Sequence, residues 1–189
     1  EAVPQGIGKM TAVLGLSQEK VIEACTEAKE YGIVEPANFN CPGQIVIGGE
    51  IKAVDEASKI AKEKGALKTV DLPVSAPFHT SMLKPAAEHL KVELEPITLG
   101  EIQTPVICNV NAEYISGIAE VKDLLYRQVM SSVLWEQIIC KMISEGVQNF
   151  VEIGPGRTLS SFVRKIDRKL GIYNVEDLAS LEATVSALS

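Results

Sequence analysis

The sequence predicts an α/β protein in which a small α+β unit precedes a longer part with alternating strands and helices. In the first seventy residues, β-branched runs and helical patterns follow one another in the order β-α-β-β-α-β. Residues 71–77 then carry two prolines within five positions and cannot form a central strand. The helices and short apolar runs beyond them are typical of a wound parallel sheet. We therefore expect two parts, residues 1–72 and residues 73–189.

The first part begins with a strand over residues 10–16. Ser17 suits the N-cap of the next helix, whose apolar residues recur at helical spacing until Gly32 stops it. Strands over 33–40 and 44–49 follow, and Pro42 with Gly43 suits the centre of a type II turn between them. A helix over 51–64 and a strand over 67–70 complete the unit. This order matches the ferredoxin-like fold.

The second part is expected to begin with a helix over residues 81–95, in which Pro85 falls in the first turn, where proline is tolerated. The remaining patterns predict, in order, a strand over 105–110, helices over 121–130 and 135–145, a short buried strand over 150–153, a helix over 158–170 and a weak final helix over 175–189.

Charge and composition exclude several classes of protein. The chain of 189 residues has 18 Lys and Arg against 25 Asp and Glu, a formal net charge of −7. Sequence-independent nucleic-acid binding needs a basic face, so no nucleic-acid partner is expected. No apolar run approaches the roughly 18 residues of a membrane helix, so no membrane partner is expected either.

The cysteines and the first residue bear on location and completeness. The four cysteines form no CxxC pair and have no histidines beside them, so we expect reduced, mostly buried thiols in a cytoplasmic protein without a metal site. They are Cys25, Cys41, Cys108 and Cys140. The chain begins at Glu1 rather than at a methionine, and we interpret it as a fragment or processed piece.

His79 is the strongest candidate for a chemical role. It lies on a proline-stiffened turn that leads into a predicted helix. The positive end of the helix dipole disfavours the imidazolium, and a general base must be neutral before it accepts a proton. The alternative is a neutral histidine that is hydrogen-bonded in a loop. His89, the other histidine, is predicted to be a solvated side chain in mid-helix.

A nucleophile to partner this base is missing from the sequence, because no Gly-x-Ser-x-Gly elbow occurs. Residues 38–44 carry several amide side chains around a tight turn. These amides either stabilise a β-hairpin turn or form the polar wall of a pocket. The glycine loop at 154–158 either packs as a turn or holds an anion, although it lacks the Walker lysine-serine pair. By themselves, Gln128 and Trp135 look like ordinary positions.

Five motifs, taken together and in order, resemble the malonyl-CoA:acyl carrier protein transacylase family of fatty acid and polyketide synthesis. The resemblance covers essentially the whole chain. The motifs are Glu1-Ala2-Val3-Pro4-x-Gly6, Asn38-Phe39-Asn40-x-Pro42-Gly43-Gln44, Leu72-Pro73-Val74-Ser75-x-Pro77-x-His79, Leu83-Lys84-Pro85-Ala86 and Glu152-Ile153-Gly154-Pro155-Gly156.

The resemblance implies an enzyme with two lobes, in which a ferredoxin-like small subdomain is inserted into a larger lobe similar to the α/β-hydrolases. In the family a serine in a Gly-His-Ser-Leu-Gly elbow attacks the malonyl thioester. By alignment His79 is the general base and acid, and the backbone carbonyl of Gln128 orients it. The serine, and the arginine that binds the malonyl carboxylate, precede Glu1 in the family pattern. Arg157 and Arg164 do not match that arginine.

The resemblance also implies substrates and partners. The chain would be the C-terminal portion of a cytoplasmic enzyme that transfers malonyl from malonyl-CoA to the phosphopantetheine thiol of acyl carrier protein, and it would be inactive without the missing N-terminal part. No metal or redox cofactor is implied. The acidic carrier protein is expected to dock on a local basic patch. Phe78 would favour malonyl over methylmalonyl groups, and Asn40 is a further candidate for substrate binding.

Three alternatives remain open at this point. Two keep the fold, namely an acyltransferase domain of a polyketide synthase and a thioester hydrolase. The third is a non-catalytic ferredoxin-like binding module.

Overall fold

The computed structural model describes residues 6–74 and 76–189, so Ser75 and the motif at 1–4 lie outside the described residues. The chain divides into two compact units, residues 1–138 and 139–189. The elements are β1 (Gly8–Leu14), α1 (Gln18–Glu27), η1 (Ala28–Tyr31), β2 (Val34–Cys41), β3 (Gln44–Glu50), α2 (Ile51–Glu63), β4 (Lys68–Asp71), η2 (Ser81–Leu83), α3 (Lys84–Leu94), α4 (Ile118–Val129), α5 (Trp135–Ser144), β5 (Asn149–Ile153), α6 (Thr158–Ile166), β6 (Gly171–Val175) and α7 (Leu178–Leu188).

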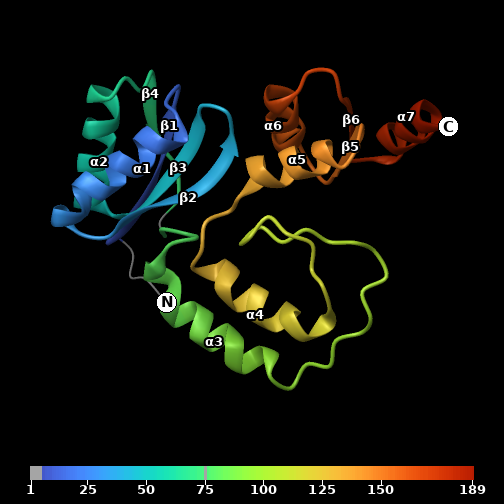
Figure 1. The fold of residues 1–189 in the computed structure, drawn as a ribbon, viewed down its shortest axis with the longest axis horizontal. Helices are drawn as coiled ribbons and strands as arrows, with labels where there is room; N and C mark the ends of the chain where they lie inside the picture. The colour runs from blue at the N-terminus through green and yellow to red at the C-terminus, as the bar shows by residue number, and fades with distance from the viewer. Residues whose placement is uncertain (1–5, 75) are drawn as a thin grey trace. The chain divides into compact units, whose positions relative to one another are not determined.

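The first unit contains a four-stranded antiparallel sheet with the strand order β2-β3-β1-β4. Helices α1 and α2 pack against one face of this sheet (Figure 1). Their apolar faces share a buried cluster with strand residues such as Val13, Ile45 and Ile47. A smaller cluster, Met10, Ala12, Ala37 and Val46, lies apart from the first. The predicted strand and helix order of residues 10–70 is confirmed to within two residues, except that the first helix ends in the 3₁₀ turn η1.

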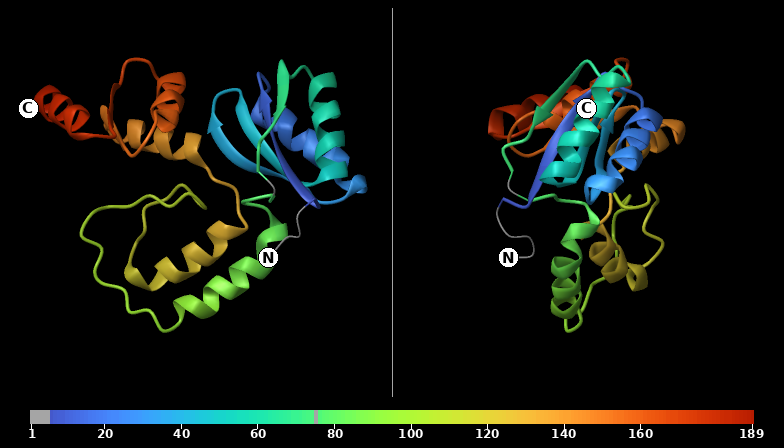
Figure 2. Two further views of the ribbon diagram at one scale, coloured as in Figure 1. Left: turned by 180° about the vertical axis from the view of Figure 1, so that it is seen from behind. Right: turned by 90° about the vertical axis from the view of Figure 1, so that its left-hand side faces the viewer.

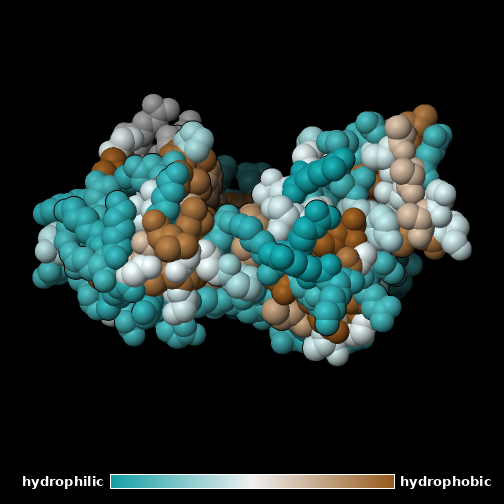
Figure 3. All heavy atoms as spheres, turned by 90° about the horizontal axis from the view of Figure 1, so that it is seen from above, coloured by the Kyte–Doolittle hydropathy of each residue, from teal (hydrophilic) through white to brown (hydrophobic). Residues whose placement is uncertain are grey.

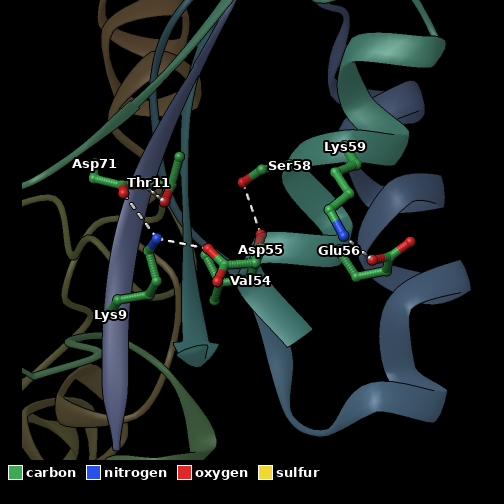
Figure 4. A network of polar contacts seen from close by, with 8 residues as sticks. All are labelled: Lys9, Thr11, Val54, Asp55, Glu56, Ser58, Lys59 and Asp71. Carbon is green, nitrogen blue, oxygen red and sulfur yellow. Dashed lines mark hydrogen bonds and ion pairs between the residues drawn. The ribbon is translucent and has the colours of Figure 1, made fainter. Parts of the chain in front are cut away.

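A polar network joins β1, β4 and α2 (Figure 4). Lys9 Nζ lies 2.7 Å from Asp55 Oδ1 and 2.8 Å from Asp71 Oδ2, and Thr11 donates to Asp71 at 2.7 Å. Burial lowers the pKa of Lys9, but its bonds to the two carboxylates outweigh this and raise the pKa above its usual value. The hydrogen bonds from Lys9 and Thr11 lower the pKa of Asp71. These bonds fix the short strand β4 against β1.

The rest of the first unit follows β4. Helices α3 and α4 pack against each other. The prediction of a strand over residues 105–110 is wrong. Pro105 has no N–H to donate to a strand partner. Within the described residues, only an isolated bridge between Ile107 and Tyr114 forms there, around a loop in which Cys108 N donates to Glu113 O.

The second unit contains β5 and β6, which pair in parallel, together with α6 and α7 (Figure 2). The strand predicted as buried is exposed along one face, with Val151 at 39% and Ile153 at 82%, while Phe150 and Glu152, which point to the other face, are half-buried. Helix α6 ends at Ile166, four residues before the predicted end, and its C-cap Asp167 is extended. Strand β6 was not predicted from the sequence.

Helix α7 begins at Asp177, whose side chain accepts from Ser180 N in a capping box. Its exposed apolar residues include Leu178 at 70% and Val185 at 55%. Figure 3 shows hydrophobic side chains that reach the surface among hydrophilic ones on the face it draws. No helix of the described residues is long and apolar enough to cross a membrane.

Candidate active site

His79 lies in a tight turn between β4 and η2. Its φ is +59°, in the left-handed region that residues other than glycine rarely adopt. The residues around it hold this conformation. Pro77 and Thr80 are buried, and Thr80 Oγ1 donates to Pro77 O at 2.6 Å. Such strain persists only where the surroundings determine it, and it is concentrated at functional sites.

The structure brings His79 and Gln128 together, although they lie 49 positions apart. Nδ1 of His79 is 3.0 Å from the backbone oxygen of Gln128. Gln128 lies in the last turn of α4, where a helix leaves carbonyl groups without intrahelical donors. Because a carbonyl only accepts, Nδ1 carries the hydrogen and donates it, which leaves the Nε2 lone pair free to accept a proton. This is the tautomer that a general base requires.

Two strand glycines accommodate the turn that carries His79. A Cβ atom on Gly8 of β1 would lie 2.4 Å from Pro77 Cδ, and one on Gly48 of β3 would lie 3.1 Å from Thr80 Cγ2. Glycine in a strand interior marks a close approach of this kind. Neither residue was predicted from the sequence; Gly48 lies within the predicted strand over residues 44–49, which was a signal that could have found it, whereas Gly8 precedes the strand predicted over residues 10–16.

The other predicted site residues lie at different distances from this turn. Phe78, next to His79, is 46% exposed. Asn40 is half-buried near the turn end of β2, where Gly43 has a φ of +70°. Asn40 lies five positions along β2 from Glu35, which lies beside the His79 turn, and a strand covers roughly 16 Å in that length. Roles of Phe78 and Asn40 in substrate binding stay predictions.

His89 is exposed on α3, with Nε2 3.6 Å from Glu93 Oε1, as expected of a solvated side chain. Among the described residues, no three His, Cys, Asp or Glu side chains come together as metal ligands. The expectation that no cofactor is needed stays a prediction.

The glycine loop at 154–158 is a largely exposed turn, and bonds within the protein occupy the N–H groups of both its glycines, with Gly154 N donating to Val175 O at 2.9 Å. The Glu152 carboxylate accepts from Leu159 N at 3.1 Å and from Ser160 N at 2.7 Å, and Gly156 N donates to Glu176. Burial raises the pKa of Glu152, but these hydrogen bonds outweigh it and lower the pKa overall. The protein's own carboxylate therefore takes the place that an anion would occupy at this helix N-terminus.

Helix α6 lines a basic groove. Arg157, Arg164 and Arg168, three of the chain's four arginines, border a cavity of about 480 Å³ together with Lys165. No residue in the described part of the chain forms an ion pair with these arginines. Guanidinium groups bind carboxylates and phosphates through paired hydrogen bonds, so this groove has the chemistry of an anion site.

Comparison of the sequence with curated proteins finds malonyl CoA-acyl carrier protein transacylases, whereas no family model matches. The protein from Bacillus subtilis (strain 168) is 44% identical over 189 residues, which cover 100% of this chain and 60% of that protein. The protein from Salmonella typhimurium is 38% identical over 186 residues, 98% of this chain and 60% of that protein. The chain thus spans about three fifths of the length of these relatives.

Solved structures agree with these relatives. A malonyl CoA-acyl carrier protein transacylase from Clostridium perfringens superposes with a TM-score of 0.95 at 49% identity, covering 100% of this chain and 59% of that chain. A structure described as a type II PKS acyl-carrier protein in complex with its malonyl-transacylase gives a TM-score of 0.95 at 39% identity, covering 98% and 60%. Over its whole length the chain is therefore similar to about three fifths of the length of malonyl CoA-acyl carrier protein transacylases, and no family model matches it.

Proposed function

We propose that the enzyme containing this chain transfers the malonyl group of malonyl-CoA to the phosphopantetheine thiol of acyl carrier protein in fatty acid biosynthesis. The observation that carries the proposal is the His79 Nδ1 to Gln128 O contact of 3.0 Å, which leaves Nε2 as a proton acceptor. Relatives named for this transfer support the substrate assignment at 38–44% identity.

In the first half-reaction a serine outside this chain attacks the thioester carbonyl, and Nε2 of His79 takes the serine proton. An oxyanion hole holds the tetrahedral intermediate. When the carbon–sulfur bond breaks, the sulfur of CoA leaves with the proton from His79, and malonyl-serine remains. In the second half-reaction His79 takes the proton of the carrier thiol, the thiol sulfur displaces the serine oxygen, and the serine regains its proton. Throughout, Gln128 O holds the imidazolium through Nδ1.

Further features of the proposal depend on the missing part of the enzyme. The serine and the carboxylate-binding arginine would come from the N-terminal part, with which this chain would assemble. Residues 1–72 would form the ferredoxin-like small subdomain, and residues 73–189 would belong to a lobe similar to the α/β-hydrolases. The strand order β2-β3-β1-β4 supports the first assignment. Phe78 would favour malonyl groups, Asn40 would line the substrate site, and the enzyme would work in the cytoplasm.

The test is transfer of labelled malonyl from malonyl-CoA to holo acyl carrier protein by the complete enzyme. Removal of a general base lowers rates by roughly 10²–10⁴-fold, and we expect a loss of this size for His79→Ala. His89→Ala, a change of the exposed histidine, is the matched control and should transfer at the wild-type rate.

The outcomes separate the alternatives. Release of free malonate without transfer would indicate a thioester hydrolase. Preference for a carrier domain of a polyketide synthase would indicate the related acyltransferases. A complete enzyme that retains no label would indicate a non-catalytic binding module, and near-normal transfer by His79→Ala would remove His79 from the mechanism.

A further inference from the structure

Strand β2 contacts the chain on both sides of the His79–Gln128 pair. On the histidine side, the Glu35 carboxylate accepts two hydrogen bonds from Ser81, two residues beyond His79. They run from the backbone N at 2.7 Å and from Oγ at 2.9 Å. Ser81 begins η2, so Glu35 satisfies an N–H that the turn leaves open.

On the glutamine side, the segment that leaves α4 pairs with the same strand. Ser132 Oγ donates to Pro36 O at 2.6 Å, and Val133 N donates to Ala37 O at 2.9 Å. Phe39 N donates in return to Val133 O at 2.9 Å. These contacts begin four residues after Gln128, so β2 fixes the end of the helix turn that presents the Gln128 carbonyl.

The strand register brings these contacts into one row across the sheet. Glu35 is the partner of Gly48 on β3, and Gly48 is the partner of Met10 on β1. Thr80 packs over Gly48, while its neighbour Ser81 bonds Glu35. The His79 turn therefore rests on the sheet at β3 and is bonded to it at β2.

We propose that Glu35 is a positioning residue, which holds the Ser81 end of the turn so that His79 Nδ1 meets Gln128 O. The bonds are charge-assisted and thus stronger than those between neutral groups. They stabilise a backbone that His79 adopts only under constraint, with its φ of +59°. Without Glu35, the Ser81 N–H loses its acceptor, the turn gains freedom and the Nδ1 bond weakens. The catalytic consequence rests on the function proposed above, whereas the effect on the histidine ring does not.

The first experiment observes the ring itself in the complete enzyme. Nitrogen-15 NMR of the imidazoles reports which nitrogen carries the proton, and the His79 signals are assigned by their loss in His79→Gln. In wild type we expect a protonated Nδ1 that exchanges slowly with water. In Glu35→Ala we expect faster exchange and a mixture of tautomers, while the signals of exposed His89 stay unchanged as an internal reference.

The second experiment measures malonyl transfer. Glu35→Ala removes both bonds to Ser81 and should lower kcat at least roughly fivefold, since the loss of a single side-chain bond at a helix start has about that effect; KM should change less than twofold. Glu35→Gln keeps an oxygen acceptor for Ser81 and should recover most of the rate. Glu50→Ala is the matched control, because the Glu50 carboxylate also accepts a backbone bond, from Ile33 N at 3.1 Å, and Ile33 is not part of the His79 turn.

The results distinguish failure of this proposal from failure of the proposed function. Unchanged His79 signals in Glu35→Ala, or equal rate losses in Glu35→Ala and Glu50→Ala, would overturn the role of Glu35. If the His79 signals change in Glu35→Ala but the complete enzyme transfers no malonyl, the role of Glu35 stands and the proposed function is rejected. If Glu35→Ala does not fold, Ser132→Ala tests the contact of β2 with the segment after Gln128. Unchanged exchange of the His79 Nδ1 proton with water in Ser132→Ala would reject β2 as the support of both residues.

Discussion

Substitution of Gly8 by alanine is expected to disturb the base through the turn that carries it. The new Cβ would lie 2.4 Å from Pro77 Cδ and 2.7 Å from Cγ. Ordinary carbon contacts begin near 3.4 Å, so the proline ring must move by about 1 Å. The ring is rigid, and Pro77 is buried. Overpacking of this kind costs about 1–3 kcal/mol of stability, and displacement of a catalytic group by ~1 Å can cost about 10²-fold in rate.

The assay compares urea unfolding and malonyl transfer in the complete enzyme. Gly100→Ala is the matched control, because a Cβ there has no heavy atom within 4 Å and the backbone is not left-handed. We expect Gly8→Ala to lower both the free energy of unfolding and kcat. Gly100→Ala should change the free energy of unfolding by no more than ~0.5 kcal/mol and should leave kcat unchanged. If Gly8→Ala transferred malonyl as fast as the control, the close packing of Pro77 on β1 would not position His79.

Three further predictions concern other parts of the chain. Because hydrogen bonds lower the pKa of Glu152, the ionised carboxylate stabilises the fold fully above its ordinary pKa of 4.5, and this stabilisation is lost as the pH falls through the lowered pKa. The difference in unfolding free energy between wild type and Glu152→Gln should therefore shrink between pH 7 and pH ~3. Gly49→Ala should destabilise the sheet by at least ~2 kcal/mol in urea unfolding, since its Cβ would lie 2.0 Å from Ile33 O at a φ of +157°. Burial raises the pKa of the Cys25 thiol to about 12, so iodoacetamide at pH 8 should label exposed Cys140 in the folded protein and leave Cys25 intact, as peptide mass spectrometry would reveal.

The sheet and helices of residues 8–71 were predictable because their signals are local. Gly32, Gly43 and Gly65 mark the ends of elements and have positive φ values in the structure. The alternating and helical patterns between them bury one cluster under α1 and α2. Where local propensity and tertiary packing agree in this way, the pattern alone predicts both the element and its buried face.

The second unit was less predictable because burial there depends on neighbours rather than on composition. The apolar run at 150–153 has the composition of a buried strand, yet Val151 is 39% exposed and Ile153 is 82% exposed. Its partner β6, Gly171–Val175, contains a glycine and an asparagine, both of which are disfavoured in strands, so the pattern did not reveal it. Of the four cysteines, which were expected to be mostly buried, Cys25 and Cys41 are buried, Cys108 is half-buried and Cys140 is exposed.

The residues of the candidate site were predictable from the sequence, but the contacts that hold His79 in place were not. His79 could be proposed from a proline-rich turn, whereas the contact to Gln128 joins segments 49 positions apart and came only from the family resemblance. Glu35 and Gly8 give no local signal of a role, because a glutamate on a strand usually means a solvated edge and Gly8 precedes the predicted strand over residues 10–16. The role of Glu35 becomes visible only when the strand register places it in one row with Gly48 and Met10.

This arrangement has a consequence for how the active site is divided along the chain. Within residues 6–74 and 76–189, the bonds that hold the base lie between Gly8 and Val133, namely those of Glu35 to Ser81, of Thr80 to Pro77, of His79 to Gln128 and of Val133 to β2. The orientation of the imidazole is therefore a property of the first unit, set by the small sheet, whereas the nucleophile would have to be brought to it by a different part of the enzyme. Substitutions of the sheet residues that support the turn, Gly8, Glu35 and Gly48, should accordingly alter proton transfer, measured as kcat, while leaving the binding of malonyl-CoA largely unchanged.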